Sequence, residues 1–200
     1  MKKFSLCLAA LAFSLSSVAQ KSEKEFARYG VSLSASPFGF GINYSYNLDS
    51  KTSLSVAVGS TLGDSDVSSF GPDVDALGDY EWETSTDWMG LFVAHRPFEK
   101  LNWLTVNAGI GIGGIENHIH AESGNEYQAD YNENPVGYFG FSARTGNVKG
   151  IQFGLDIGTL YTSGPDSFGE AGDAAEVDAI LENLTPNLLP NVQFSVGYGF

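Results

Sequence analysis

Apolar and polar residues alternate one by one along eight segments of the chain. A period of two places successive side chains on opposite faces of a β-strand, so each segment is predicted to be a strand with one apolar and one small or polar face. The segments lie near residues 28–36, 39–48, 53–59, 82–95, 102–115, 139–144, 151–158 and 191–200. The last of them ends on the apolar set Val192, Phe194, Val196, Tyr198 and Phe200.

The connections between these segments alternate between short and long. Short turns are expected at 49–51, 96–101 and 145–149, and long polar segments at 63–81, 116–134 and 163–190. This pattern predicts an all-β fold, namely an eight-stranded antiparallel up-and-down transmembrane β-barrel with short periplasmic turns and long acidic extracellular loops. We expect the barrel to be closed, because lipid leaves no tolerable unpaired strand edge.

Charge is sorted between the two ends of this barrel. The long segments, together with the first residues of the fourth strand through Asp87, hold nineteen acidic residues and no Lys or Arg. Beyond residue 20, the basic residues fall in the lead-in to the first strand or at the short-turn end: Lys21, Lys24, Arg28, Lys51, Arg96, Lys100, Arg144 and Lys149. A barrel held across a membrane explains this sorting, whereas a soluble β-sandwich does not require it.

Residues 1–19 are predicted to be a cleaved signal peptide. Lys2 and Lys3 precede a short apolar run, and small residues lead up to Ala19. The run is shorter than the ~20 apolar residues with which a helix spans a bilayer. Residues 20–200 then form one barrel domain. Its net charge is −16, because cleavage removes Lys2 and Lys3 from a chain of net charge −14. Its lack of cysteine excludes disulfides and thiolate chemistry, because Cys7 is the one cysteine of the chain.

Aromatic residues flank the apolar band of the predicted barrel, as rings do at headgroup level. We expect one girdle at each end. Tyr46, Phe98, Trp103 and Phe200 are assigned to the short-turn end, and Trp82, Trp88, Tyr138 and Tyr161 to the loop end.

Four segments together resemble the small OmpA-like outer-membrane proteins of Gram-negative bacteria. They are Met89–Phe98, Asn134–Phe141, Gly154–Gly158 and Leu189–Phe200. The resemblance implies a barrel located in the bacterial outer membrane. It also implies that the apolar face of the last strand, from Val192 to the terminal Phe200, is the signal read by the barrel-assembly machinery.

The inward faces are rich in glycine, which predicts a partly hydrated lumen even though eight-stranded barrels are normally filled by their own side chains. Arg144 and Asp156, on neighbouring strands, are the charged residues expected to face inward. Two interpretations remain open for this pair: a structural ion pair that plugs the lumen, or a selectivity constriction.

Three further candidates lie outside the barrel wall. Glu116, His118, His120 and Glu122 recur at every second residue, which suits a metal site but is also typical of a solvated loop. Ser123 with these histidines offers the parts of a hydrolase, although no motif surrounds them. Residues 173–184 have apolar residues at helical spacing and predict a short amphipathic helix over the barrel mouth, either packed intramolecularly or available to a partner.

We expect a non-enzymatic envelope structural or surface-interaction protein that acts through its acidic loops. The expected partners are outer-membrane lipid and lipopolysaccharide, whose phosphates divalent cations would bridge to the loops. The loops would repel nucleic acid, and no cofactor is implied. A narrow cation-preferring channel is the alternative, and a lipid A-modifying enzyme is a further one.

Overall fold

The computed structural model describes residues 25–68, 71–131, 135–165, 167–169 and 172–200, so the expected signal peptide lies outside the described residues. The described residues form the helix α2 Ala174–Asn183 and the strands β1 Tyr29–Ser36, β2 Gly39–Asn47, β3 Thr52–Ser60, β4 Ser65–Asp66, β5 Glu81–His95, β6 Leu104–His120, β7 Glu126–Tyr131, β8 Val136–Arg144, β9 Gly150–Tyr161, β10 Ser167–Gly169 and β11 Leu188–Gly199. Within the described ranges, no helix is both long and apolar enough to span a membrane.

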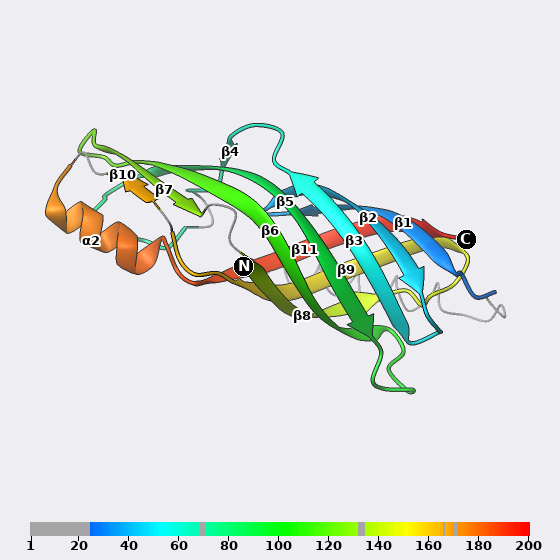
Figure 1. Cartoon of the computed structure of the whole chain (residues 1–200). Helices are drawn as coiled ribbons and strands as arrows, with labels where there is room; N and C mark the ends of the chain where they lie inside the picture. Colours follow the sequence, from blue (N-terminus) through cyan, green and yellow to red (C-terminus); the bar gives the residue numbers. More distant parts are fainter. Residues whose placement is uncertain (1–24, 69–70, 132–134, 166, 170–171) are drawn as a thin grey trace, which may run out of the picture.

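Eight strands close into an antiparallel barrel in which each strand pairs with the next along the chain (Figure 1): β1, β2, β3, β5, β6, β8, β9 and β11. The ring is completed by β11 pairing with β1, from Gly30 opposite Gly199 to Ala35 opposite Phe194. Beyond the last paired residues, Tyr29 N donates to Phe200 O at 3.0 Å, and Phe200 N donates to Tyr29 O at 2.9 Å. The predicted fold class is therefore confirmed.

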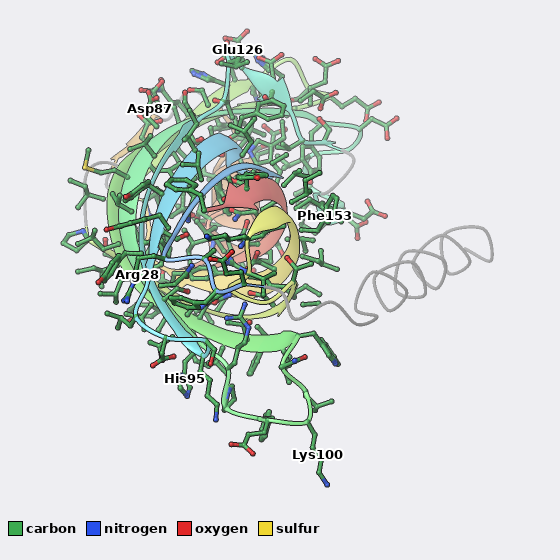
Figure 2. All side chains as sticks on the ribbon, turned by 90° about the vertical axis from the view of Figure 1, so that its right-hand side faces the viewer. Arg28, Asp87, His95, Lys100, Glu126 and Phe153 are labelled. Atoms are coloured by element: carbon green, nitrogen blue, oxygen red, sulfur yellow. The ribbon has the colours of Figure 1, made fainter. Side chains whose placement is uncertain are left out.

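The barrel is apolar outside and polar inside. Leu33 and Ile110, which point away from the wall, are 63% and 66% exposed, whereas the inward Thr105 and Asn107 are buried. Figure 2 shows the barrel end-on from the short-turn end, with side chains projecting from the outside of the wall and Lys100 in the turn after β5. This is the reverse of a water-soluble fold, and it fits a wall that has lipid on its outer side.

The inward glycines do not leave an empty lumen, because aromatic rings lie over them. A Cβ added to Gly59 would lie 2.5 Å from ring carbons of Trp88, and one added to Gly158 would lie 2.6 Å from the hydroxyl oxygen of Tyr138. The ring of Phe92 covers Gly109 in the same way and meets Tyr138 edge-on, with 5.7 Å between ring centroids. Trp88 and Tyr138 therefore do not belong to the outer girdle to which the sequence pattern assigned them. Their side chains fill the lumen.

The connections at the loop end are more ordered than expected. β5 and β6 continue beyond the barrel as a paired ribbon that ends with Glu81 opposite His120, and β7 pairs with β6 from Ile115 to His120. The short strands β4 and β10 add to the two edges of this sheet, and α2 lies beside it at the left of Figure 1. Much of what the sequence analysis treated as loops at 63–81, 116–134 and 163–190 is thus a folded unit. We call the part of β5 and β6 beyond the barrel, with β4, β7, β10 and α2, the extension.

We predict that Gly59→Ala destabilises the barrel by about 1–3 kcal/mol, because the new methyl group forces the Trp88 ring out of its place. The matched control is Gly137→Ala, where the nearest atom to an added Cβ is 4.0 Å away. The measurement is the urea midpoint of unfolding, followed by heat-modifiable gel mobility. Equal midpoints for the two variants would contradict the proposed ring packing.

Candidate functional site

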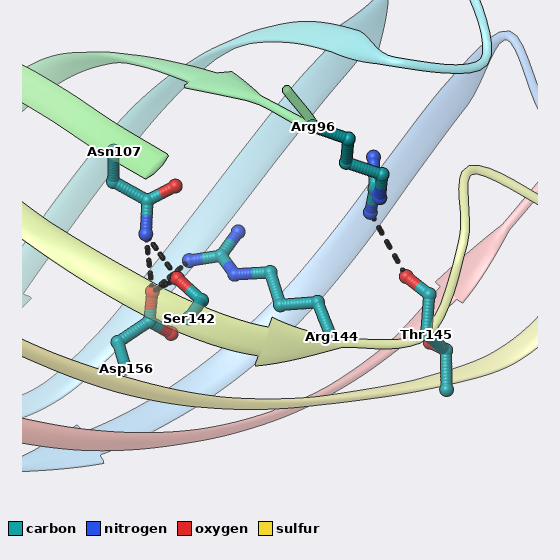
Figure 3. A network of polar contacts seen from close by, with 6 residues as sticks. All are labelled: Arg96, Asn107, Ser142, Arg144, Thr145 and Asp156. Carbon is teal, nitrogen blue, oxygen red and sulfur yellow. Dashed lines mark hydrogen bonds and ion pairs between the residues drawn. The ribbon is translucent and has the colours of Figure 1, made fainter. Parts of the chain in front are cut away.

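A polar cluster lies inside the barrel on three neighbouring strands, β6, β8 and β9 (Figure 3). Arg144, the last residue of β8, donates from Nη2 to Asp156 Oδ1 of β9 at 2.6 Å. Asn107 of β6 donates from Nδ2 to the same oxygen at 2.8 Å, and the Ser142 hydroxyl also donates to it. The two charged residues expected to face inward are thus joined directly, with two neutral donors that the sequence analysis did not single out.

This cluster is desolvated but not fully paired. Asp156 is 2% exposed, and the Arg144 side chain is 29% exposed. Asp156 Oδ2 and Asn107 Oδ1 are buried and have no hydrogen-bond partner in the described part of the chain. A buried carboxylate requires a paired charge, which Arg144 supplies here, and the remaining acceptors can bind water or another small donor.

A second polar layer closes the lumen nearer to the short-turn end. Arg96, directly after β5, is 4% exposed and donates from Nη1 to Asn147 Oδ1 at 2.8 Å. Its Nη2 donates to Thr145 O at 3.0 Å, as Figure 3 shows. Asn147 in turn donates from Nδ2 to Asp49 O at 3.0 Å. The sequence analysis treated Arg96 only as a turn residue. Arg96 comes two residues after the inward-facing Ala94, so the period of two of β5 predicts that Arg96 also faces inward.

Two cavities lie on either side of Arg144. The larger, of about 120 Å³, extends from Arg144 and Asp156 to Ser163 and Gly164 at the extension end, and its wall includes Trp88. The smaller, of about 50 Å³, lies between Arg144 and Arg96. The charged residues lining the two cavities are two arginines and one aspartate, so the lining has no excess of negative charge.

The extension has a hydrophobic core of its own outside the barrel. Its buried residues come from the 71–80 segment, the β6–β7 hairpin and α2: Val74, Leu77, Ile119, Ala121, Tyr127, Ile180 and Leu184. Trp82 packs against this core and donates from Nε1 to Asn117 Oδ1 at 3.0 Å, so it too is absent from the outer girdle. The helix expected at 173–184 is therefore present, and it packs intramolecularly against the hairpin.

A buried carboxylate fastens α2 to the hairpin. Glu176, in the first turn of α2, accepts hydrogen bonds from Asn125 Nδ2 at 2.9 Å and from the Tyr127 hydroxyl. These bonds, with a contribution from Ser123, lower the pKa of Glu176, and the Tyr127 bond is the largest cause. Burial, and next the bond to Glu176, raise the pKa of Tyr127, so the phenol stays protonated and continues to donate.

The opposite face of the extension sheet carries the expected histidines. His118 lies opposite Glu83 of β5 and Gln128 of β7, and His120 lies opposite Glu81 and Glu126. His120 Nδ1 is 3.6 Å from Glu126 Oε1. Among the described residues, no three His, Cys, Asp or Glu side chains are grouped as a metal site would require.

The parts of a hydrolase are not assembled in the described structure. Ser123 Oγ accepts from Asn125 N at 3.3 Å in the turn between β6 and β7, and no hydrogen bond joins Ser123 to His118 or His120. The nucleophile and base of a Ser–His pair need such a contact. These residues therefore provide no catalytic arrangement.

The apolar face of the terminal strand points away from the lumen. Its members are between 44% and 56% exposed, and they form one row along the outside of β11 and the chain end: Val192, Phe194, Val196, Tyr198 and Phe200. Phe200 lies 5.9 Å from Tyr29, between ring centroids, within the aromatic group at the short-turn end. The row therefore lies on the outside of the barrel, and its role as an assembly signal stays a prediction.

Three solved structures share this fold. CarO from Acinetobacter baumannii is 16% identical over 87% of this chain and 98% of its own, with a TM-score of 0.61. CarO2 from the same organism is 15% identical over 88% and 100%, also with a TM-score of 0.61. A major outer membrane protein from Thermus thermophilus is 14% identical over 86% and 99%, with a TM-score of 0.50.

No family model and none of the curated proteins matches the chain. At these identities the structural likeness shows the fold alone. The fold is that of a bacterial outer-membrane β-barrel.

We predict that acid loosens the docking of α2. The pKa of Glu176 in the folded state is below the ordinary 4.5, so its stabilisation is complete above that pH and is lost as the pH falls through the lowered value. Hydrogen exchange of residues 174–183, corrected for intrinsic rates, should rise at acidic pH while β11 stays protected. Glu176→Gln should show weak protection already at neutral pH. Glu182→Gln, an exposed change on the same helix, is the control, and an identical pH profile in both variants would refute the assignment.

Proposed function

We propose that this chain is a non-enzymatic outer-membrane barrel that works through its extension at the cell surface, where the acidic sheet face binds lipopolysaccharide phosphates through divalent cations. The single observation that carries this proposal is the hydrophobic core built outside the barrel wall. A barrel needs only turns to close, so a separate core holding a sheet and a helix beyond the membrane indicates a function for that surface.

The charge of the extension determines how it can meet lipopolysaccharide. The outer sheet face exposes carboxylates on β5, β6 and β7, and the segments 61–88, 113–135 and 162–190, which contain the extension, have no Lys or Arg. Direct contact with phosphate groups would therefore be repulsive. A divalent cation that binds a carboxylate on one side and a phosphate on the other removes this repulsion, and oxygen ligands suit Mg²⁺ and Ca²⁺.

Lipopolysaccharide retention tests this proposal. Refolded protein should retain lipopolysaccharide through gel filtration in Mg²⁺ and lose most of it in EDTA. The triple variant Glu81→Gln, Glu83→Gln and Glu126→Gln removes charge from the sheet face and should retain several-fold less. The control Asp64→Asn, Asp73→Asn and Asp75→Asn removes the same charge from exposed positions outside that face and should behave like the wild type. The proposal would be contradicted if the two triple variants retained equal amounts of lipopolysaccharide, or if EDTA did not reduce the amount that the wild type retains.

A narrow channel is a second candidate, because cavities lie on both sides of Arg144 and this side chain lines both of them. In planar bilayers, the double variant Arg144→Gln and Asp156→Asn should then give larger single-channel steps than the wild type, since it removes the ion pair without leaving a lone buried charge. Silent bilayers for both proteins, with folding verified by gel mobility, would identify the lumen as plugged. The Arg96 layer favours that outcome.

A further inference from the structure

The small cavity of about 50 Å³ at the short-turn end has an unusual lining. Both arginines of the lumen, Arg96 and Arg144, border it. Asp156 does not, and no other carboxylate is among its lining residues. The remaining wall consists mainly of hydroxyl and amide groups, among them those of Asn43, Asn47, Ser53 and Asn147.

Both arginines keep an unused donor. The Nε atoms of Arg96 and Arg144 are buried, and neither has a hydrogen-bond partner in the described residues. Arg96 as a whole is 4% exposed, so bulk water does not solvate it as it would a surface arginine. A buried N–H without a partner costs about 1–3 kcal/mol, and more when the group is charged.

The two guanidinium groups also repel each other. Arg96 lies in the turn after β5, outside the barrel strands, and its burial together with the positive charge of Arg144 lowers its pKa to about 10. At neutral pH Arg96 therefore remains charged. Asp156 neutralises Arg144, so the layers around the small cavity carry one uncompensated positive charge.

We propose that this cavity is a binding site for one small inorganic monovalent anion, such as chloride or bromide. The anion would lie between Arg96 and Arg144, accept from their free Nε–H groups and from the surrounding hydroxyl and amide donors, and balance the excess charge. The size agrees, because about 50 Å³ is several times the ~10–15 Å³ that one water-sized sphere needs, so a monatomic anion fits in the cavity.

This inference goes beyond the surface function and is independent of it. An anion held at this point would stabilise the closed short-turn end by linking β5 to β8. It would also occupy the path that a cation would have to follow through the lumen. The site therefore argues against the cation-preferring channel that the sequence analysis left as an alternative.

Bromide is the probe for the test, because it replaces chloride and scatters anomalously. Crystals of the refolded protein grown in sodium bromide should show an anomalous peak between Arg96 and Arg144. In detergent solution at equal ionic strength, the thermal midpoint should be higher in sodium bromide than in sodium gluconate, whose organic anion is far bulkier than bromide.

Variants separate this site from a general salt effect. Arg96→Gln should lose the difference between the two salts, and Lys100→Gln, an exposed change at the same end of the barrel, should keep it. If Arg96→Gln fails to fold, the double variant Arg144→Gln and Asp156→Asn takes its place and should also lose the difference. Equal wild-type midpoints in the two salts, or no bromide peak in the cavity, would overturn the proposal. A peak without a midpoint shift would mean binding at crystal concentration only, and would overturn it as well.

Discussion

Closure of the strand ring is the constraint on which the rest of this structure depends. Lipid offers no hydrogen-bond partner, so each backbone N–H and C=O within the membrane has to be paired inside the protein. The pairing of β11 with β1, extended by the reciprocal bonds between Tyr29 and Phe200, supplies the last partners. Once the ring is closed, Leu, Ile, Phe and Val on the outer faces of the strands can contact lipid. The side chains on the inner faces have to fill the interior of the barrel.

The interior of the barrel is filled in two ways. Aromatic rings pack over glycines, and charged side chains form hydrogen bonds with amide side chains. An eight-stranded barrel is just wide enough to be filled by side chains, so a ring on one strand needs space on the next. Trp88 over Gly59 and Phe92 over Gly109 show this arrangement in the extension half. Towards the short-turn end, Asp156 and Arg96 organise two polar layers instead. Side chains thus fill most of the barrel interior, and the extension is the part outside the barrel that has its own hydrophobic core.

The sequence predicted the barrel strands well because lipid outside and water or polar groups inside impose a strict period of two. It also contained a signal for the inward rings, since Trp88 and Phe92 have the opposite parity to Met89, Leu91 and Val93 in the same strand. The extension was harder to predict. The polar outer face of residues 116–131 is typical of a loop, whereas Ile119 and Tyr127 are buried in a core formed with the 71–80 segment and with α2, some fifty residues later in the chain.

The site residues show the same division. Arg144 and Asp156 were predictable as neighbours, because parity and a short turn place both inside the barrel. The hydrogen-bond partners of Asn107 and Arg96 were not, because these partners depend on strand register around the ring and on the turn at Asn147. Such contacts join residues roughly fifty positions apart, and a local period cannot reveal them.

Crosslinking across the closing pair tests the central claim most directly. Ser34 and Ser195 face each other in the register of β1 and β11, and the chain beyond residue 19 contains no cysteine. The account predicts that Ser34→Cys with Ser195→Cys is joined efficiently by a short bifunctional thiol reagent in outer membranes, while Ser34→Cys with Ser53→Cys, on β3, is not. Absence of the first crosslink, with both thiols reactive toward a monofunctional reagent, would contradict a closed eight-stranded barrel.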